Sequence, residues 1–229
     1  MSQNSIKKIL LVGCTGYIGS HVLEILIKRK FRVICIGRNL KKLKDRFNNT
    51  QSSFIELNLD SDVEYKDLSS KIQQIDAIVS CIGSRTGGIA DSWQVEYEIN
   101  KKLLNFSELV NCKKFILLSA ICVQKPKLSF QFAKIKFENL LISSNITYSI
   151  VRPTAYFKSL AGQVQNVIKG KSFIVFDNGK KTACKPISES DLATFICDCL
   201  TLKDRENKIL PIGGKGPSIS PLEQGELIF

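Results

Sequence analysis

Short apolar runs alternate with amphipathic stretches from the start of the chain. The first stretch carries Ile18, Val22 and Leu26 on one helical face, and a longer one, residues 95–110, has the same period. Strands that alternate with helices predict right-handed βαβ crossovers and a parallel sheet covered by helices on both faces. The strand-like runs are Lys8–Val12, Arg32–Ile36, Phe54–Leu57, Ala77–Cys81, Phe115–Ser119 and Tyr148–Val151.

The pattern changes after Arg152-Pro153. Ser188 is the expected N-cap of one later helix, with Asp191 as an acidic capping partner three residues on. A last helix is expected to open at Ser220-Pro221, but its apolar face has little to pack against before Phe229, so we interpret the end of the chain as a truncation. The other predicted elements are helices over 155–169 and Ser188–Leu200 and strands over Ser172–Phe176 and Lys208–Ile212.

The composition is that of an ordinary soluble globular protein, and no apolar run reaches the roughly 18–20 residues that span a bilayer. The short polar start, Met1 to Ile6, leaves no room for a signal or transit peptide. The formal net charge is +12, yet the lysines and arginines form no concentrated patch. This spread favours a solvated surface over nucleic-acid binding, and it is compatible with a phosphate-rich cofactor or a carboxylated substrate.

The eight cysteines contain no Cys-x-x-Cys pair and lie mostly within apolar runs. We therefore expect buried free thiols and no zinc or iron–sulfur site. The single histidine, His21, falls in the first turns of the first predicted helix, where we expect a structural role. This inventory excludes a Ser-His-Asp triad.

A glycine-rich loop, Gly13-Cys14-Thr15-Gly16-Tyr17-Ile18-Gly19, follows the first predicted strand. A lone glycine triad is a weak signal, but here it opens a βαβ unit, which makes the signal strong. Gly13 permits the tight turn, Gly16 lets the backbone approach a pyrophosphate, and Gly19 allows close packing of helix and strand. The phosphates are expected on free N–H groups at the helix N-terminus, so Thr15, Tyr17 and Ile18 also belong to the candidate cofactor site. The spacing resembles that of extended and atypical short-chain dehydrogenases.

The end of the second predicted strand favours NADPH over NADH. An NAD enzyme usually has an acid there for the ribose hydroxyls. This chain has Gly37-Arg38, followed by Lys41, Lys42 and Lys44. A cation suits a 2′-phosphate that an acid would repel, so we assign Arg38 to the cofactor site.

Three other segments are expected beside the cofactor. Asn58-Leu59 lies near the adenine, although Asn58 replaces the aspartate usual in this superfamily. The fourth strand ends in Cys81-Ile82-Gly83, where the backbone passes close to the ribose, and Pro153 follows the sixth. Asn100 is either a cofactor-side residue or a solvent-facing one. Residues 1–153 are thus expected to form an NADP-binding domain, an α/β doubly wound Rossmann-type parallel sheet. Residues 154–229 are expected to form an incomplete substrate-binding lobe, partly interleaved with the sheet.

The catalytic tyrosine typical of short-chain dehydrogenases is absent. These enzymes follow a serine at the end of strand five with Tyr-x-x-x-Lys, whose tyrosine transfers a proton while the lysine holds the ribose. Here Ser119 is followed by Phe130 and by Lys134, which lies in a predicted helix around 132–138. The usual carbonyl–alcohol chemistry is therefore excluded, and Ser119 and Lys134 are candidate site residues.

Five long and unusual runs carry a more specific signal: Gly87–Trp93, Leu117–Pro126, Ser149–Leu160, Cys184–Glu189 and Pro221–Glu226. Together they resemble the NADPH-dependent divinyl chlorophyllide 8-vinyl-reductases of plants, algae and some photosynthetic bacteria. The resemblance runs from the first strand to the last residue. Chains of that family continue past the equivalent of Phe229 into helices that help to form the pigment pocket.

The resemblance implies reduction of the 8-vinyl group of a divinyl chlorophyllide or protochlorophyllide to ethyl, with hydride from NADPH, in chlorophyll biosynthesis. Vinyl reduction needs no alkoxide-handling tyrosine, in agreement with Phe130. Water, Tyr156, Lys158 and Ser119 are the candidate proton donors. The implied compartment is the plastid stroma or the cytoplasm of a photosynthetic bacterium, and peripheral association with photosynthetic membranes is compatible with it. The oligomeric state stays open.

Two other interpretations share the fold. A non-enzymatic NADP(H)-binding redox sensor or photosystem assembly factor would share Gly13–Gly19 and Lys134, but it is not expected to carry the runs Ile121–Pro126 and Arg152–Leu160. An isoflavone-reductase-like enzyme acting on an aromatic small molecule is supported at the level of the fold alone.

Overall fold

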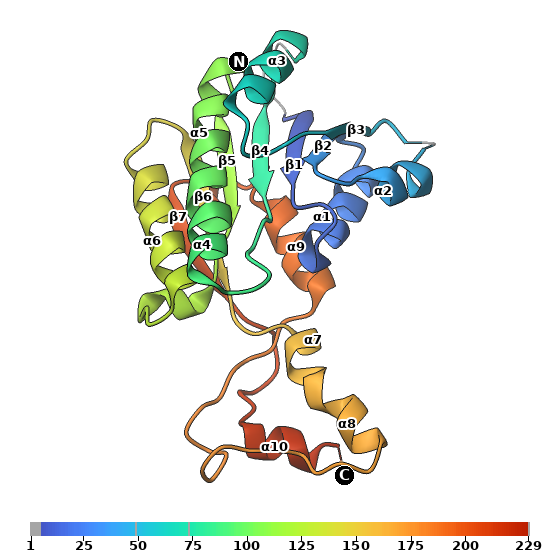
Figure 1. Cartoon of the computed structure of the whole chain (residues 1–229), viewed down its shortest axis with the longest axis vertical. Coiled ribbons are helices and arrows are strands. Elements are labelled where there is room, and N and C mark those ends of the chain that lie inside the picture. The colour runs from blue at the N-terminus through green and yellow to red at the C-terminus, as the bar shows by residue number, and fades with distance from the viewer. Residues whose placement is uncertain (1–5, 49, 73, 229) are drawn as a thin grey trace.

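The computed structural model describes residues 6–48, 50–72 and 74–228. The polar start before Ile6 and the terminal Phe229 lie outside these ranges. Within them, seven parallel strands form one sheet in the order β3-β2-β1-β4-β5-β6-β7 (Figure 1). The order reverses between β1 and β4, which confirms the doubly wound α/β fold. The strands are β1 (Lys8–Val12), β2 (Arg32–Gly37), β3 (Ser53–Glu56), β4 (Ala77–Ser80), β5 (Lys114–Leu118), β6 (Thr147–Pro153) and β7 (Lys208–Ile212).

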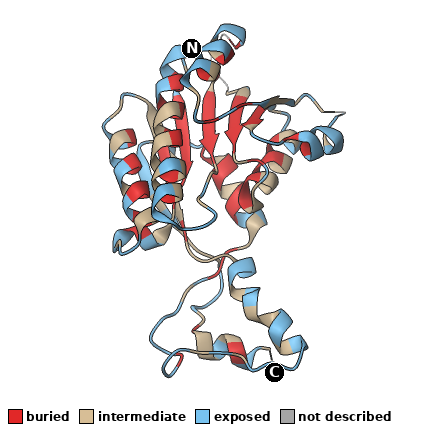
Figure 2. Cartoon of the chain, viewed as in Figure 1, coloured by how far each residue is buried: buried red, intermediate tan, exposed pale blue. Residues whose placement is uncertain are grey.

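Helices cover both faces of the sheet and divide the core in two. In β1, Ile9 and Leu11 face one core while Leu10 and Val12 face the other, as the two-residue period of a strand requires. Figure 2 shows the buried residues gathered on the strands and on the inner faces of the helices. One face carries α1 (Tyr17–Lys28), α2 (Lys41–Arg46) and α9 (Glu189–Asp198); the other carries α3 (Asp62–Lys71), α5 (Ile99–Leu109) and α6 (Ser129–Ile142).

Helix-like stretches were predicted between the strands, but no bounds were predicted for α2 and α3, and a third helix is more complex than predicted. The short α2 and α3 bury few apolar side chains; in α3 these are Tyr65 and Leu68, too few to mark a helical stripe. The predicted helix over 95–110 begins in a π-helical segment, Trp93–Glu98, which follows α4 (Ile89–Ser92) and leads directly into α5. Such π-helical turns occur frequently at functional sites.

After β6 the chain leaves the sheet for a lobe of short elements (Figure 1). The single helix predicted over 155–169 is wrong in detail, because a 3₁₀ turn, Ala161–Gln163, separates two shorter helices. The strand predicted over Ser172–Phe176 is also wrong: the side-chain amide of Gln163 satisfies the backbone N–H and C=O of Ile174, so no strand partner is required. The helices of the lobe are α7 (Phe157–Leu160), α8 (Val164–Ile168) and α10 (Pro221–Glu226).

The predicted helix starts are confirmed by their caps. The Ser188 hydroxyl accepts the N–H of Asp191 at 3.0 Å at the start of α9. Ser220 and Glu223 form a reciprocal capping box in front of α10. Between the segments that form the lobe, the chain returns to the sheet through α9 and β7. The domain boundary at residue 153 stays a prediction. Within the described part of the chain, no helix combines the length and hydropathy needed to cross a bilayer.

Candidate functional site

The glycine loop between β1 and α1 is held by close backbone contacts. Gly13 has a φ of +85°, and a Cβ there would lie 2.6 Å from the backbone of Cys81. A Cβ on Gly19 would lie 2.1 Å from the Gly13 oxygen. Gly16 precedes α1, and no side chain caps this helix. The N-terminus of α1 is therefore available to an anion.

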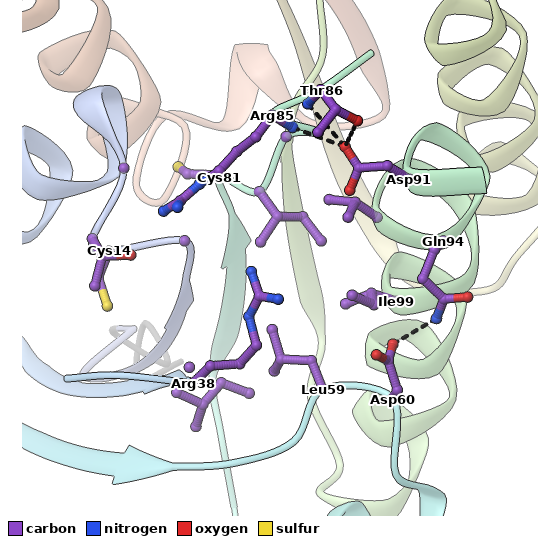
Figure 3. A pocket seen from close by; sticks show the side chains of 18 of the residues that line it. Cys14, Arg38, Leu59, Asp60, Cys81, Arg85, Thr86, Asp91, Gln94 and Ile99 are labelled. Atoms are coloured by element: carbon purple, nitrogen blue, oxygen red, sulfur yellow. Dashed lines mark hydrogen bonds between the residues drawn. The ribbon is translucent and has the colours of Figure 1, made fainter. Parts of the chain in front are cut away.

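A cavity of about 680 Å³ opens in front of this loop, at the sheet's switch point (Figure 3). Ligands of open α/β sheets bind at such a point. The cavity brings together many of the predicted cofactor residues, namely Gly13, Thr15, Gly16, Arg38, Leu59, Cys81, Ile82 and Gly83.

The other predicted cofactor residues do not line this cavity. Ile18 is buried in the core, and Gly19 packs on Gly13 behind the loop. Asn58 lies in a shallow depression beside Arg38. The remaining three are Tyr17, Lys134 and Pro153, whose surroundings are described below.

Two guanidinium groups point into the cavity, as Figure 3 shows. Arg38 comes from the end of β2, and Arg85 comes from the loop after β4. Neither is in an ion pair with a described carboxylate within 4.0 Å. The cavity thus holds two cations that are free to bind phosphate. Arg85 was not predicted as a site residue, because the sequence of a loop does not indicate where its side chains point.

Asp91 fixes the loop that carries Arg85. Its carboxylate accepts the backbone N–H groups of Thr86 and Arg85, both at 3.1 Å, and the Thr86 hydroxyl at 2.9 Å. These bonds, with that from the Thr86 backbone the largest influence, hold the pKa of Asp91 below its usual value. The rim of the cavity is therefore ordered by an ionised side chain.

Lys134 is buried and paired with a carboxylate that the sequence did not reveal. Its Nζ lies 2.7 Å from Oε2 of Glu96, which is 3% exposed. The second oxygen, Oε1, accepts the N–H of Ser84 at 2.9 Å, directly after the cavity-lining Gly83. Glu96 therefore ties α6 to the loop after β4.

The π-helical segment that carries Glu96 is held by Asn100. The Asn100 amide donates to the Glu96 carbonyl oxygen at 3.0 Å, and its Oδ1 accepts the Ser80 hydroxyl at 2.6 Å. Asn100 is 1% exposed, so the solvent-facing alternative for this residue is wrong.

Ser119 lies in a second buried network. Its hydroxyl donates to Glu138 on α6, and the same carboxylate pairs with Arg152 of β6. The Ser119 proton is thus engaged by Glu138, and Ser119 lines neither of the two large cavities. Glu138 lies four residues beyond Lys134, a spacing that places both side chains on one helix face.

A second cavity, of about 860 Å³, opens at the carboxyl ends of β5, β6 and β7. Phe130, Pro153 and Tyr156 line it. Cys122 does so too: all eight cysteines are free as expected, but Cys122 is exposed and not buried.

Tyr156 lines the second cavity and lies near Cys81, a residue of the first. Burial raises the pKa of its hydroxyl above the usual value, and the nearby Cys81, Glu96 and Cys122 add to this effect. Cys81 lines the first cavity, and Tyr156 and Cys122 line the second. A side chain with this placement can act on a molecule that is held in contact with both cavities.

Tyr17 and Lys158 contact each other outside the two large cavities. The Tyr17 hydroxyl donates to Glu189 at 2.6 Å, and this hydrogen bond is the main cause that raises the pKa of Tyr17 to about 12. The Lys158 Nζ lies 4.4 Å from the centre of the Tyr17 ring, and the ring of His21 packs edge-on against it at 5.9 Å. Neither Lys158 nor His21 lines a large cavity.

An open parallel sheet with an uncapped glycine loop at its switch point, facing two unpaired guanidinium groups, defines a dinucleotide-binding protein of the Rossmann type. The chain belongs to the NAD(P)H-binding family, whose model matches residues 13–203.

Curated proteins and solved structures that are similar to this chain indicate which members of the class it resembles. The chloroplastic divinyl chlorophyllide a 8-vinyl-reductase of Cucumis sativus is 49% identical over 96% of this chain and 56% of its own length. The photosystem II assembly factor Ycf39 of Cyanophora paradoxa is 25% identical over 90% of this chain and 63% of its own length. The NADPH-dependent quinone oxidoreductase QOR2 of Escherichia coli has a TM-score of 0.80 at 17% identity, over 96% of this chain and 74% of that one, and shows the fold alone. The chain thus spans little more than half the length of the reductase that it matches.

Proposed function

We propose that this chain carries out NADPH-dependent reduction of the 8-vinyl group of divinyl chlorophyllide or protochlorophyllide to ethyl, in chlorophyll biosynthesis. The observation that carries the proposal is the placement of Tyr156, which lines the second large cavity and lies near Cys81 of the first, while Phe130 replaces the usual catalytic tyrosine. The 49% identity to a protein named for this activity supports it, whereas the assembly factor is far more distant.

The first cavity is proposed as the NADPH site. The uncapped start of α1 offers backbone N–H groups to the pyrophosphate, and the missing side chain of Gly16, which lines the cavity, lets the backbone approach it closely. Arg38 is assigned to the 2′-phosphate, and Arg85 supplies a second cation over the phosphates. When bound, NADPH supplies a hydride to the vinyl group.

The second cavity is proposed as the pigment site. Its volume falls within the roughly 300–1,000 Å³ of small-molecule sites, and its walls are mainly apolar. A macrocycle seated there would place an edge against Tyr156, beside the first cavity. Pro153, predicted as a cofactor residue, lines this second cavity and would lie at the junction of the two.

Tyr156 is proposed as the proton donor. One vinyl carbon gains the hydride, and the electron pair of the former π bond takes a proton at the other carbon. The raised pKa of Tyr156 keeps the phenol protonated until it donates, and solvent then restores the proton. Lys134 is proposed to hold the cofactor ribose, and Ser119 to hold the end of β5 through Glu138. Lys158 is engaged with Tyr17, and water is the alternative donor.

We propose the plastid stroma, or the cytoplasm of a photosynthetic bacterium, as the compartment. The chloroplastic relatives support the first location. Peripheral association with a photosynthetic membrane would bring the protein to a hydrophobic pigment.

The decisive experiment mixes the purified chain with divinyl chlorophyllide and NADPH and follows the Soret band. A shift to shorter wavelength that requires NADPH is expected, together with its loss in Lys134→Ala. Lys136→Ala is the matched control, because Lys136 is an exposed lysine on the same helix that packs over Trp93 and Tyr97. Tight NADPH binding without any shift, in this chain and in one extended to the full length of its relatives, would favour the sensor or assembly-factor alternative.

A further inference from the structure

The second cavity has an unusual charge distribution. Among the residues that line it, a single side chain is charged, that of Lys185. Its neighbours at the cavity are apolar or carry neutral hydroxyl and thiol groups: Ala120, Ile121, Cys122, Phe130, Pro153, Thr154, Ala155, Tyr156, Ser159, Ala183, Cys184, Pro211, Ile212, Gly213 and Ser218. A cavity of this kind fits a large apolar ligand that carries one negative charge.

The backbone of Lys185 is fixed at this position. Its carbonyl oxygen accepts the Thr154 hydroxyl and the N–H of Gly214, the latter at 3.3 Å. A Cβ on Gly213 would lie 3.1 Å from the Lys185 Cβ, so the chain directly after β7 packs closely against this residue. Pro186 and Ile187, which follow, are buried. The lysine is therefore a positioned residue and not part of a loose loop.

The Lys185 ammonium has no counter-ion among the described residues, because it is in none of the ion pairs within 4.0 Å. By contrast, Lys181 in the same lobe is paired with Asp177. An unpaired cation that lines an apolar cavity attracts an anionic group of the ligand.

We propose that Lys185 recognises a free carboxylate on the tetrapyrrole, so that the site selects pigments with an unesterified side-chain acid. The inference rests on the proposed function and deepens it: the macrocycle fills the apolar cavity and the acid reaches the Lys185 ammonium. Divinyl chlorophyllide has one free propionate, and the rest of the pigment is uncharged. An esterified pigment lacks the charge and leaves the cation without a partner.

The test compares divinyl chlorophyllide with its methyl ester, which differs in that one charge. Binding to the 229-residue chain is titrated by pigment absorbance and fluorescence. The wild-type chain is expected to bind the acid about tenfold more tightly than the ester, in line with one hydrogen bond to a charged group. Lys185→Met should bind both pigments with the affinity of the wild type for the ester, and Lys185→Arg should restore the preference.

Lys171→Met is the matched control, since Lys171 is an exposed lysine of the same lobe that does not line the cavity. It should retain the preference for the acid. Equal binding of acid and ester by the wild type, or an unchanged preference in Lys185→Met, would overturn the role of Lys185 and leave the proposed function intact. Failure of both pigments to bind, in this chain and in one extended to the full length of its relatives, while NADPH still binds, would overturn the proposed function together with this inference.

Discussion

The proposed role of Tyr156 as proton donor can be tested separately from cofactor binding. Tyr156→Phe should lower the turnover number at least tenfold and leave the Kd for NADPH unchanged, because the phenol is proposed to donate the proton and not to bind the cofactor. Single-turnover kinetics measure the first quantity and fluorescence titration the second. Tyr148→Phe is the matched control, since Tyr148 is a partly buried tyrosine of β6 that lines neither large cavity. Intact turnover in Tyr156→Phe would identify water as the donor.

The same residue makes a prediction about pH. Burial raises the pKa of Tyr156, so the hydroxyl remains protonated well above the ordinary value for tyrosine of about 10. The donor form is therefore present at neutral pH and is lost only above that value. The turnover number, measured with saturating substrates, should show no fall from titration of Tyr156 between neutral pH and about 10. A basic limb near the ordinary tyrosine pKa, absent in Tyr156→Phe, would contradict this assignment.

The two arginines of the cofactor cavity should act on different parts of the dinucleotide. Arg38→Ala is expected to weaken NADPH binding about tenfold and to leave NADH binding nearly unchanged, because its proposed partner is the 2′-phosphate. Arg85→Ala should weaken both dinucleotides, since both carry the pyrophosphate. Titration of each variant with NADPH and NADH makes each arginine the control for the other, and an identical pattern in the two variants would refute the separate roles.

Glu96 connects the Lys134 side chain on α6 to the loop after β4. Glu96→Gln leaves the Lys134 ammonium buried without its counter-ion, and its single amide oxygen can accept from either Lys134 or the Ser84 N–H but not from both as the carboxylate does. The variant should therefore be less stable and bind NADPH more weakly. Glu206→Gln is the control, because it breaks another ion pair to a buried lysine, Lys114, at the opposite end of the sheet. Both variants should lower the Tm, and only Glu96→Gln should weaken NADPH binding, by about tenfold. An equal NADPH affinity in the two variants would reduce Glu96 to a structural partner.

Among the helices, strands and loops, the sequence predicted best those whose structure depends on residues close together in the chain. The loop from Gly13 to Gly19, the cap at Ser188 and the helix start at Ser220 formed as predicted, because each depends on residues a few positions apart. The strand expected over Ser172–Phe176 did not form, since a strand needs a neighbour that periodicity cannot provide.

In the candidate site too, residues could be predicted where the chain order determines their place, but not where tertiary packing does. The cavity residues of the glycine loop and the strand ends could be anticipated, because a parallel sheet brings its carboxyl ends together. The partners Glu96 and Glu138 could not. Glu96 is 38 positions from Lys134, and Glu138 is 19 from Ser119, and each reaches its partner only through tertiary packing.

The loop and helix that follow β1 form a unit whose packing can be tested. Gly19→Ala would place a Cβ 2.1 Å from the Gly13 oxygen, so the unit must shift. A loss of about 1–3 kcal/mol in the free energy of unfolding is expected, as for other overpacked positions. Gly162→Ala is the control, because no atom lies within 4 Å of its added Cβ. Denaturant unfolding measures both; equal stability of the two variants would show that the close approach is not required.

In the molecule as a whole, the two proposed binding regions are built on parts of the chain that differ in how fully their apolar side chains are buried. The first cavity is built on the sheet, whose strands β1, β4 and β5 are almost fully buried. The second is bounded partly by the lobe that carries α7, α8 and α10, where Phe157, Ile168 and Phe176 remain exposed. Segments with few buried apolar contacts open at lower free energy than the global unfolding. The lobe should therefore be the less stable part of the protein.

Amide hydrogen exchange would show this difference and connect it to substrate binding. In the free protein, the amides of α8 should exchange faster than those of β5, which is buried along its whole length. NADPH alone should slow exchange in the glycine loop and in the loop after β4, because the proposed cofactor site does not include the lobe. Divinyl chlorophyllide should slow exchange around 183–187 and in α7, since Ser159 and Lys185 line the second cavity. Protection of the sheet alone by the pigment would contradict a pigment site that unites the two parts of the chain.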